Sequence, residues 1–95
     1  MLKLFSAKGH TNKGMCILIG NFLFTGDTII LNTKPVLKNR YGASIEDYKN
    51  TIEKIYKTIS YDTIVFPAHG NLFRLVEMKT FFEEYFADNG MIVNL

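Results

Sequence analysis

The run TIVF at residues 63–66 limits the fold of this chain more than any other segment. It is apolar or β-branched at consecutive positions and ends at Pro67, a pattern typical of a strand that is buried on both faces. Earlier residues of the chain likewise supply apolar side chains to two faces of a sheet: Ile17, Ile19, Phe22, Phe24, Ile29 and Leu31. The sequence therefore predicts a sheet that needs cover on both sides.

Two segments have the periodicity of amphipathic helices, residues 44–59 and residues 72–87. In the first, Ser44 is the expected N-cap and Asp47 stands at the capping-box position, with an apolar stripe made of Ile45, Tyr48, Ile52, Ile55 and Ile59. The second ends at Asn89-Gly90, the expected C-cap. Because one layer of two helices covers one face only, we expect an exposed apolar patch on the order of several hundred Å² or more, through which the chain dimerises or aggregates.

Short apolar runs predict strands at residues 2–7, 15–19, 22–25 and 28–31. Gly20-Asn21 is the expected hairpin turn between the second and third of them. Residues 91–93 are left open as a last short strand or a tail. The order of elements predicts an α/β (α+β) fold, a mixed/antiparallel sheet with helices on one face, in a single domain of residues 1–95.

Composition narrows the class of protein. The 95 residues are 47% apolar and carry a net charge of +2, which is ordinary for a globular domain and gives no reason to expect a nucleic-acid partner. No apolar run approaches the roughly 20 residues of a membrane span, and the first residues lack the features of a signal peptide. Cys16 has no partner for an internal disulfide, so we expect a cytoplasmic protein with Cys16 in its core.

Three residues with metal-binding side chains follow predicted strands in glycine-framed loops: His10 in GHT, Asp27 in GDT and His69 in AHG. Strand ends commonly gather the site of an α/β sheet, and imidazole with carboxylate is a donor set that zinc, iron and manganese accept. We expect the Asp27 carboxylate to be buried at the end of its apolar strand, and a bound cation would offset the cost of that burial. On spacing alone, two loop histidines and a turn aspartate without any ligand remain the alternative.

Four segments taken together, AKGHTNKGMCIL, LFTGDTII, SIEDYKNTIEKI and DTIVFPAHG, closely resemble in this order the second half of the metallo-β-lactamase superfamily fold. The resemblance covers about residues 2–71 and implies that the chain is the C-terminal half of an αββα sandwich. Zinc β-lactamases usually carry cysteine where Asp27 stands. The aspartate therefore favours the branches related to glyoxalase II, to phosphodiesterases or nucleases, and to flavodiiron proteins over antibiotic hydrolysis.

The resemblance also implies residue roles. His10 would bind the first metal, His69 the second, and Asp27 would bridge both as the catalytic ligand, while Thr11 and Thr28 would orient these ligands. Zinc is the expected metal, with iron or manganese as alternatives, and the implied reaction is hydrolysis of an ester, thioester or phosphodiester by a metal-bridging water. The basic loop after the Asp27 strand supplies candidate contacts to an anionic small-molecule substrate, with a merely solvated loop as the alternative: Lys38, Arg40 and Tyr41.

The first half of such enzymes contributes an H-x-H-x-D-H motif, and this sequence has no such stretch and two histidines in all. Two ligands per metal are fewer than the three or four of zinc sites. We therefore expect weak or absent metal binding and no appreciable hydrolysis by the chain alone.

Three explanations are open for the missing motif. The chain is a fragment or mis-started reading frame of a full hydrolase, one subunit of a split enzyme, or a degenerate descendant kept for an interaction role. The first two require an N-terminal half as partner. The third is a non-catalytic module that self-associates or docks on another protein.

Overall fold

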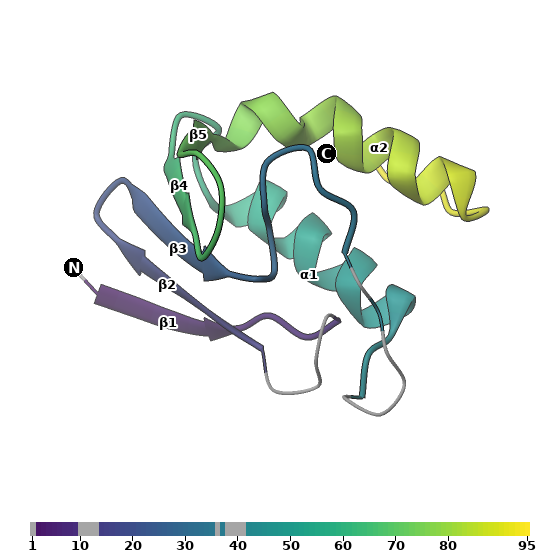
Figure 1. Ribbon diagram of the computed structural model, residues 1–95, viewed down its shortest axis with the longest axis horizontal. Helices are drawn as coiled ribbons and strands as arrows, with labels where there is room; N and C mark the ends of the chain where they lie inside the picture. The colour runs from purple at the N-terminus through teal and green to yellow at the C-terminus, as the bar shows by residue number, and fades with distance from the viewer. Residues whose placement is uncertain (1, 10–13, 36, 38–41) are drawn as a thin grey trace.

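A computed structural model describes residues 2–9, 14–35, 37 and 42–95 (Figure 1). The five strands of its single sheet are β1 (Leu2–Ser6), β2 (Met15–Ile19), β3 (Phe22–Gly26), β4 (Ile64–Pro67) and β5 (Phe73–Arg74). Two α-helices accompany the sheet, α1 (Ile45–Thr58) and α2 (Lys79–Asp88). This is the α+β architecture that the order of sequence patterns predicts. The predicted site residues His10, Thr11, Lys38, Arg40 and Tyr41 lie outside the described residues.

The strands lie in the order β1-β2-β3-β4-β5, and β3 with β4 is the parallel pair in an otherwise antiparallel sheet. β2 and β3 form the hairpin predicted around Gly20-Asn21, in which Gly20 has a φ of 56°. The parallel pairing requires a crossover between β3 and β4, and α1 is part of it. As a consequence, β3 and β4 end at the same edge of the sheet.

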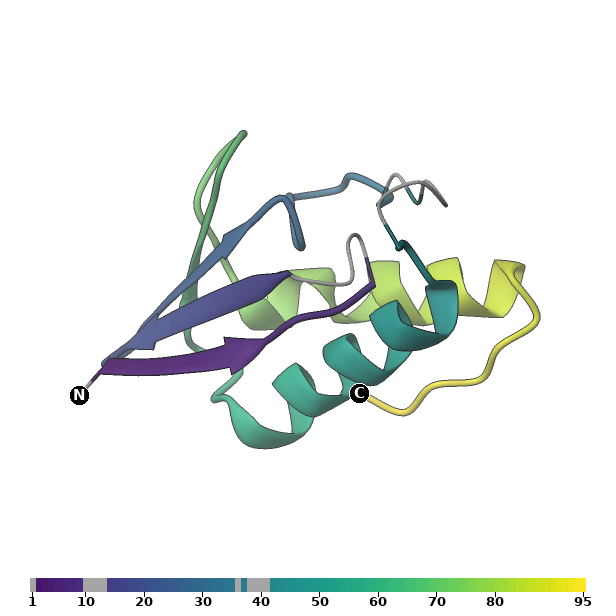
Figure 2. The same ribbon diagram turned by 90° about the horizontal axis from the view of Figure 1, so that it is seen from below.

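Helix α1 begins where its capping residue predicts. The Ser44 side chain accepts a hydrogen bond from the Asp47 backbone nitrogen at 3.2 Å, which satisfies one of the free N–H groups of the first turn. The apolar stripe faces the sheet, with Ile52 and Ile55 fully buried. Figure 2 shows α1 and α2 on the same side of the strands. The described helices include none that is long and apolar enough to cross a membrane.

The second predicted helix begins later than residue 72, and this boundary was wrong. Phe73 pairs with Val65 as part of β5, and a 3₁₀ turn (Leu75–Met78) precedes α2. The backbone of Arg74 is extended, and its nitrogen donates to Glu77 Oε2 at 2.6 Å, so the helical path starts only after Arg74. The apolar spacing of the helix starts at Leu75 and says nothing about the residues before it, which can as well be a short strand, and so the predicted start was too early.

One further prediction on a short segment is corrected, and one open alternative is decided. Residues 28–31 form no strand; Ile30 makes an isolated β-bridge with Thr33 instead, because the chain turns sharply after Gly26, whose φ is 55°. Residues 91–93, left open as a short strand or a tail, form an irregular tail, and Val93 is buried against the core. At the C-terminus of α2, Asn89 is the C-cap and Gly90 follows with a φ of 76°, as predicted.

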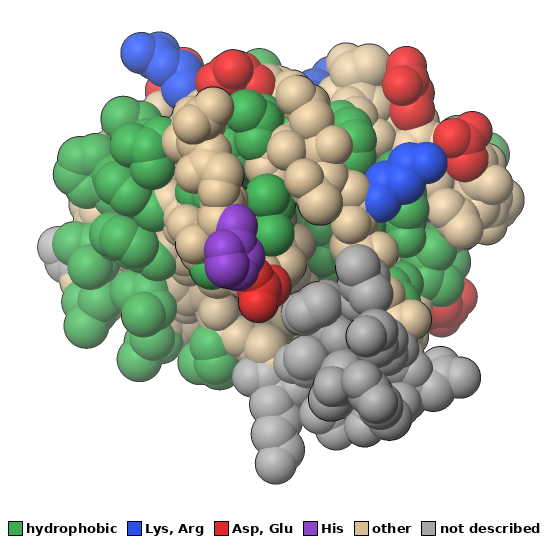
Figure 3. Space-filling model, viewed as in Figure 1, with side chains coloured by type: hydrophobic (Ala, Val, Ile, Leu, Met, Phe, Trp, Pro, Cys, Tyr) green, Lys and Arg blue, Asp and Glu red, His purple; other side chains and the backbone are tan. Residues whose placement is uncertain are grey.

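The two faces of the sheet differ in what covers them. One face packs on the helices through Cys16, Leu23 and Val65, all fully buried. The other face carries, in paired register, the apolar side chains Leu2, Leu4, Ile17, Ile19, Phe22, Phe24, Ile64 and Phe66, five of which are exposed. We call this set the open sheet face. Figure 3 shows hydrophobic side chains gathered on the side of the molecule where the strands lie in Figure 1.

Candidate functional site

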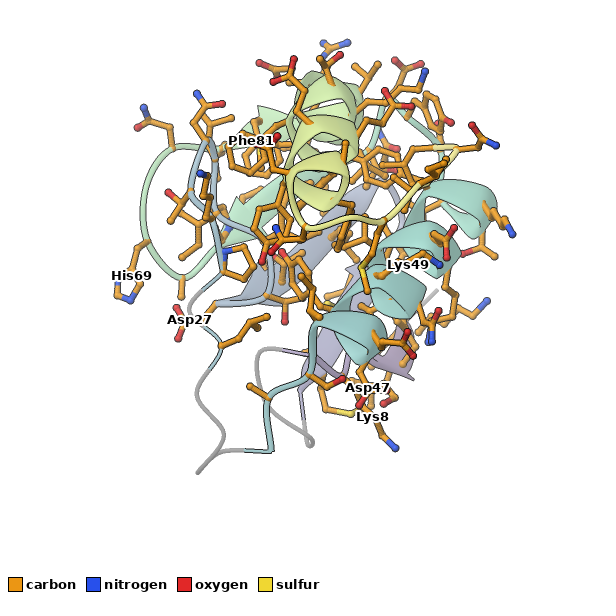
Figure 4. All side chains as sticks on the ribbon, turned by 90° about the vertical axis from the view of Figure 1, so that its right-hand side faces the viewer. Lys8, Asp27, Asp47, Lys49, His69 and Phe81 are labelled. Atoms are coloured by element: carbon orange, nitrogen blue, oxygen red, sulfur yellow. The ribbon has the colours of Figure 1, made fainter. Side chains whose placement is uncertain are left out.

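The candidate site lies just beyond the adjacent ends of β3 and β4. Asp27 follows the last residue of β3, and His69 follows the last residue of β4 by two positions. Because these strands are parallel, their carboxyl ends bring together two residues that are far apart in the sequence. Figure 4 shows the labelled side chains of Asp27 and His69 next to each other at this edge.

Asp27 Oδ1 lies 3.5 Å from His69 Nε2. The two groups form an ion pair only when the imidazole is protonated, and the distance also suits two donors that share one cation. Their side chains are 51% and 76% exposed. The expectation of a buried carboxylate at the end of β3 was therefore wrong: Asp27 projects past the apolar strand into solvent, which already reduces the cost of its charge.

Backbone geometry brings the two side chains together. The Ala68 nitrogen donates to the Gly26 carbonyl at 3.0 Å and so ties the loop of His69 to the residue before Asp27. The register of β3 and β4 shifts between Phe24 and Gly26, and the positive φ of Gly26 turns the chain outward at that point. The glycine before Asp27 therefore makes the turn and accepts the hydrogen bond that joins the two loops.

Buried threonines close the turn that carries Asp27. The Thr28 nitrogen donates to the Thr25 carbonyl at 2.9 Å, and Thr25 Oγ1 donates to the Ile29 carbonyl at 2.9 Å. Thr28 itself is 6% exposed, and its side chain acts to lower the pKa of the Cys16 thiol, which burial raises more strongly. The interpretation of Thr28 as a residue that orients its neighbour is compatible with this turn and stays a prediction.

The donors present suit a divalent metal in kind but are incomplete in number. A carboxylate and an imidazole, close together and accessible, are the ligands that zinc, iron and manganese use. Among residues 2–9, 14–35, 37 and 42–95, no group of three or more His, Cys, Asp or Glu side chains could hold an ion. The third predicted ligand, His10, is outside those residues, so the ligand roles of all three stay predictions.

Two residues that sequence reasoning treated only as core or loop turn out to support the site. The Tyr48 hydroxyl donates to the Thr28 carbonyl at 2.7 Å, and Gly9 packs directly on the backbone of Tyr48. A tyrosine within an apolar helical stripe is a usable signal, because a buried hydroxyl needs a partner. The sequence does not tell which carbonyl that partner is.

No family model matches the chain. Two curated proteins are similar to it in sequence. The probable polyketide biosynthesis zinc-dependent hydrolase BaeB of Bacillus velezensis is 39% identical over 61 residues, which are 64% of this chain and 27% of BaeB. The probable polyketide biosynthesis zinc-dependent hydrolase PksB of Bacillus subtilis is 34% identical over 61 residues, with the same coverage. The chain thus spans about a quarter of the length of these relatives.

Solved structures share the fold. TTHA1623, crystallised in a di-iron-bound form, matches with a TM-score of 0.73 and 18% identity over 81% of this chain and 39% of its own. ST1585 from Sulfolobus tokodaii, an archaeal metallo-β-lactamase superfamily protein, matches with a TM-score of 0.67 and 24% identity over 99% of this chain and 37% of its own. Each match covers well under half of the larger protein.

Proposed function

The chain has the fold of the metallo-β-lactamase superfamily, as its motifs predicted, and on that premise we propose that it is the C-terminal part of a metal-dependent hydrolase. The observation that carries the proposal is the 3.5 Å approach of Asp27 to His69 at the joined ends of β3 and β4. The zinc-dependent hydrolases among its relatives support the reaction class. In this proposal residues 1–95 form one domain that corresponds to the second half of an αββα sandwich.

In the proposed site, Asp27 and His69 hold divalent metal together with His10. A metal in this position supplies a water of lowered pKa and polarises the bond to be cleaved in an ester, thioester or phosphodiester. Asp27 contributes the negative charge that keeps a cation at the strand ends. His69 Nε2 binds only without a proton, so protons and metal compete for the same atom. Zinc is our first choice, and the di-iron form of TTHA1623 supports iron as the alternative.

The remaining donors must come from elsewhere, because the sequence contains no H-x-H-x-D-H segment. We propose that an N-terminal half supplies them and packs on the open sheet face, from the same gene or from a separate subunit. Hydrolysis by the 95 residues alone should then be negligible, since two ligands per metal are fewer than the three of a catalytic zinc site.

Complementation tests this function. The chain is mixed or co-expressed with the H-x-H-x-D-H half of a full-length zinc-dependent hydrolase, and turnover of a generic thioester and a generic phosphodiester is measured. We expect hydrolysis in the mixture, none with either half alone, and loss of activity with His69→Ala but not with Lys49→Ala, a surface variant on α1. Turnover by the chain alone that disappears in His69→Ala would contradict the proposed inactivity, and equal mixture activity for both variants would contradict the role of His69.

The open sheet face favours a second candidate, a non-catalytic module that associates through this surface. Exposed Leu2, Leu4 and Phe22 give it a contiguous apolar area without any catalytic requirement. The metal content of purified chain separates the two candidates. Bound zinc or iron that is lost on Asp27→Asn supports the hydrolase, and absence of metal with unchanged folding in that variant supports the module.

A further inference from the structure

We propose that Tyr48 on α1 is a positioning residue for Asp27, whose turn it holds in place through the Thr28 carbonyl. The inference rests on the proposed function, because it assigns to Tyr48 a part in building the metal site. It concerns a residue that touches neither metal nor substrate in this proposal. Tyr48 acts through the backbone on which the carboxylate is mounted.

The turn of Asp27 is anchored at both ends by groups from other elements. On one side the Gly26 carbonyl accepts the hydrogen bond from the Ala68 nitrogen at 3.0 Å. On the other side the Thr28 carbonyl accepts the bond from the Tyr48 hydroxyl at 2.7 Å. Asp27 lies between these two anchored peptide groups, so losing either anchor loosens the carboxylate relative to His69.

The hydroxyl of Tyr48 is itself held in place by packing. Tyr48 is 1% exposed, and its ring centroid lies 6.2 Å from that of Phe82, 6.4 Å from Tyr85 and 5.9 Å from Phe86. Burial raises the pKa of Tyr48 far above its usual value, so the hydroxyl keeps its proton and remains a donor. Thr28, which supplies the accepting carbonyl, is buried as well.

The same turns of α1 hold the segment that leads toward His10. The Ser44 nitrogen donates to the Gly9 carbonyl at 2.9 Å, and Thr51 Oγ1 donates to the Lys8 carbonyl at 2.6 Å. A Cβ on Gly9 would lie 2.6 Å from the Tyr48 nitrogen, so the two backbones are in contact. One face of α1 therefore fixes both the chain up to Gly9 and the turn of Asp27.

Tyr56 gives a matched control for testing Tyr48. It lies on the same helix and is 4% exposed. Its hydroxyl donates to the carbonyl of Leu75 at 2.6 Å, and Leu75 is bonded to Thr63 just before the start of β4, at the other end of that strand from His69. Tyr48→Phe and Tyr56→Phe each delete one buried hydroxyl and keep the ring. Both should destabilise the chain to a similar extent, so any difference between them at the site reports position rather than stability.

Two measurements on the full chain, each on wild type, both tyrosine variants and Asp27→Asn, test the proposal. Amide hydrogen exchange without metal should be faster at Thr28 and Ile29 in Tyr48→Phe than in Tyr56→Phe. Affinity for zinc alone, measured by titration, should fall about tenfold or more in Tyr48→Phe and stay at the wild-type value in Tyr56→Phe.

The possible results distinguish a failure of the positioning role of Tyr48 from a failure of the proposed function. Equal exchange at Thr28 in the two tyrosine variants, or equal zinc affinity, overturns the positioning role. Zinc binding that survives Asp27→Asn unchanged overturns the proposed function instead, and so does zinc binding that is absent from wild type even with the H-x-H-x-D-H half present. In that case the exchange comparison still decides whether Tyr48 holds the turn, because it requires no metal.

Discussion

Asp27 and His69 take their places from backbone hydrogen bonds and turns, and their side chains reach into solvent. The glycines beside them shape the backbone. Gly26 turns the chain, and its carbonyl accepts a hydrogen bond from the Ala68 nitrogen. Gly70 has a φ of 86°, and a Cβ added to it would lie 3.6 Å from Ile30. The glycines, which have no side chain to bind a ligand, therefore set how closely the side chains of Asp27 and His69 approach each other.

Gly9→Ala should be strongly destabilising. Gly9 has a φ of 139°, and an added Cβ would overlap the Tyr48 backbone, so strain and overpacking together should cost about 2–4 kcal/mol. Urea unfolding measures the loss. Gly20→Ala is the control, because Gly20 also has a positive φ but nothing lies within 4 Å of an added Cβ. Equal losses for the two variants would contradict the packing of Gly9 on Tyr48.

Cys16 predicts a loss of stability at alkaline pH. Burial raises the pKa of its thiol from 9.0 to about 11 in the folded chain, against a smaller lowering by the hydrogen bond from Thr28. The unfolded chain therefore ionises first, and the contribution of Cys16 is complete below pH 9 and lost as the pH rises toward 11. Urea midpoints from pH 8 to 10 should fall, and the fall should be smaller in Cys16→Ala. The same slope in both proteins would show that other groups are responsible.

At the residue level, the glycine-framed motifs predicted which donor side chains come together. The sequence did not predict how exposed these side chains are. The motifs around Asp27 and His69 predicted that the two would meet, and the structure brings them together. The prediction that Asp27 is buried was wrong, because the sequence of an apolar strand does not specify how far the next residue projects past its end. The hydroxyl of Tyr48 found a partner 20 positions away, which no local pattern specifies.

Among the elements, α1 connects the sheet to the site. Its start and its apolar stripe followed from Ser44 and the spacing of isoleucines, since capping and periodicity are local properties. Its role in the crossover did not, because the parallel pairing of β3 with β4 is a long-range feature. The start of α2 could not be predicted in this way. Phe73 could be buried equally well in a strand, and its pairing with Val65 is a long-range contact. The apolar residues 28–31 likewise pack without pairing as a strand.

Ser44→Ala should destabilise the chain by about 1 kcal/mol, since it removes the acceptor for the Asp47 nitrogen at the start of α1. Thermal or urea unfolding followed by circular dichroism measures this change. Ser60→Ala is the matched control: Ser60 accepts from the Asp62 nitrogen at 3.3 Å in an exposed loop, and its loss should be within about 0.5 kcal/mol. A negligible effect of Ser44→Ala would contradict the capping role.

The whole molecule is a sheet with one covered and one open face. The sequence predicted this from consecutive apolar residues in the fourth strand and from the presence of only two helical patterns. What covers the open face does not follow from either pattern, because neither specifies a second surface. An N-terminal half and a second copy of the chain remain competing occupants.

At micromolar concentration the isolated chain should associate through the open sheet face. Sedimentation velocity should show dimers or larger species that bind a hydrophobic dye, and Phe22→Lys should shift them toward monomer by placing a charge on that face. Ile92→Lys is the control, because Ile92 is 89% exposed but lies in the C-terminal tail. A wild-type chain that sediments as a monomer and binds no dye would contradict this expectation.

The proposed metal-dependent function depends most on whether Asp27 and His69 act together as metal ligands. Zinc titration followed by NMR tests this directly, since the sequence has two histidines to assign. We predict that zinc shifts the imidazole signals of His69 and His10 together, and that Asp27→Asn weakens or abolishes both shifts. Imidazole signals that zinc leaves unchanged even when the H-x-H-x-D-H half is present, or shifts that persist at the same zinc concentration in Asp27→Asn, would contradict this role of the two residues.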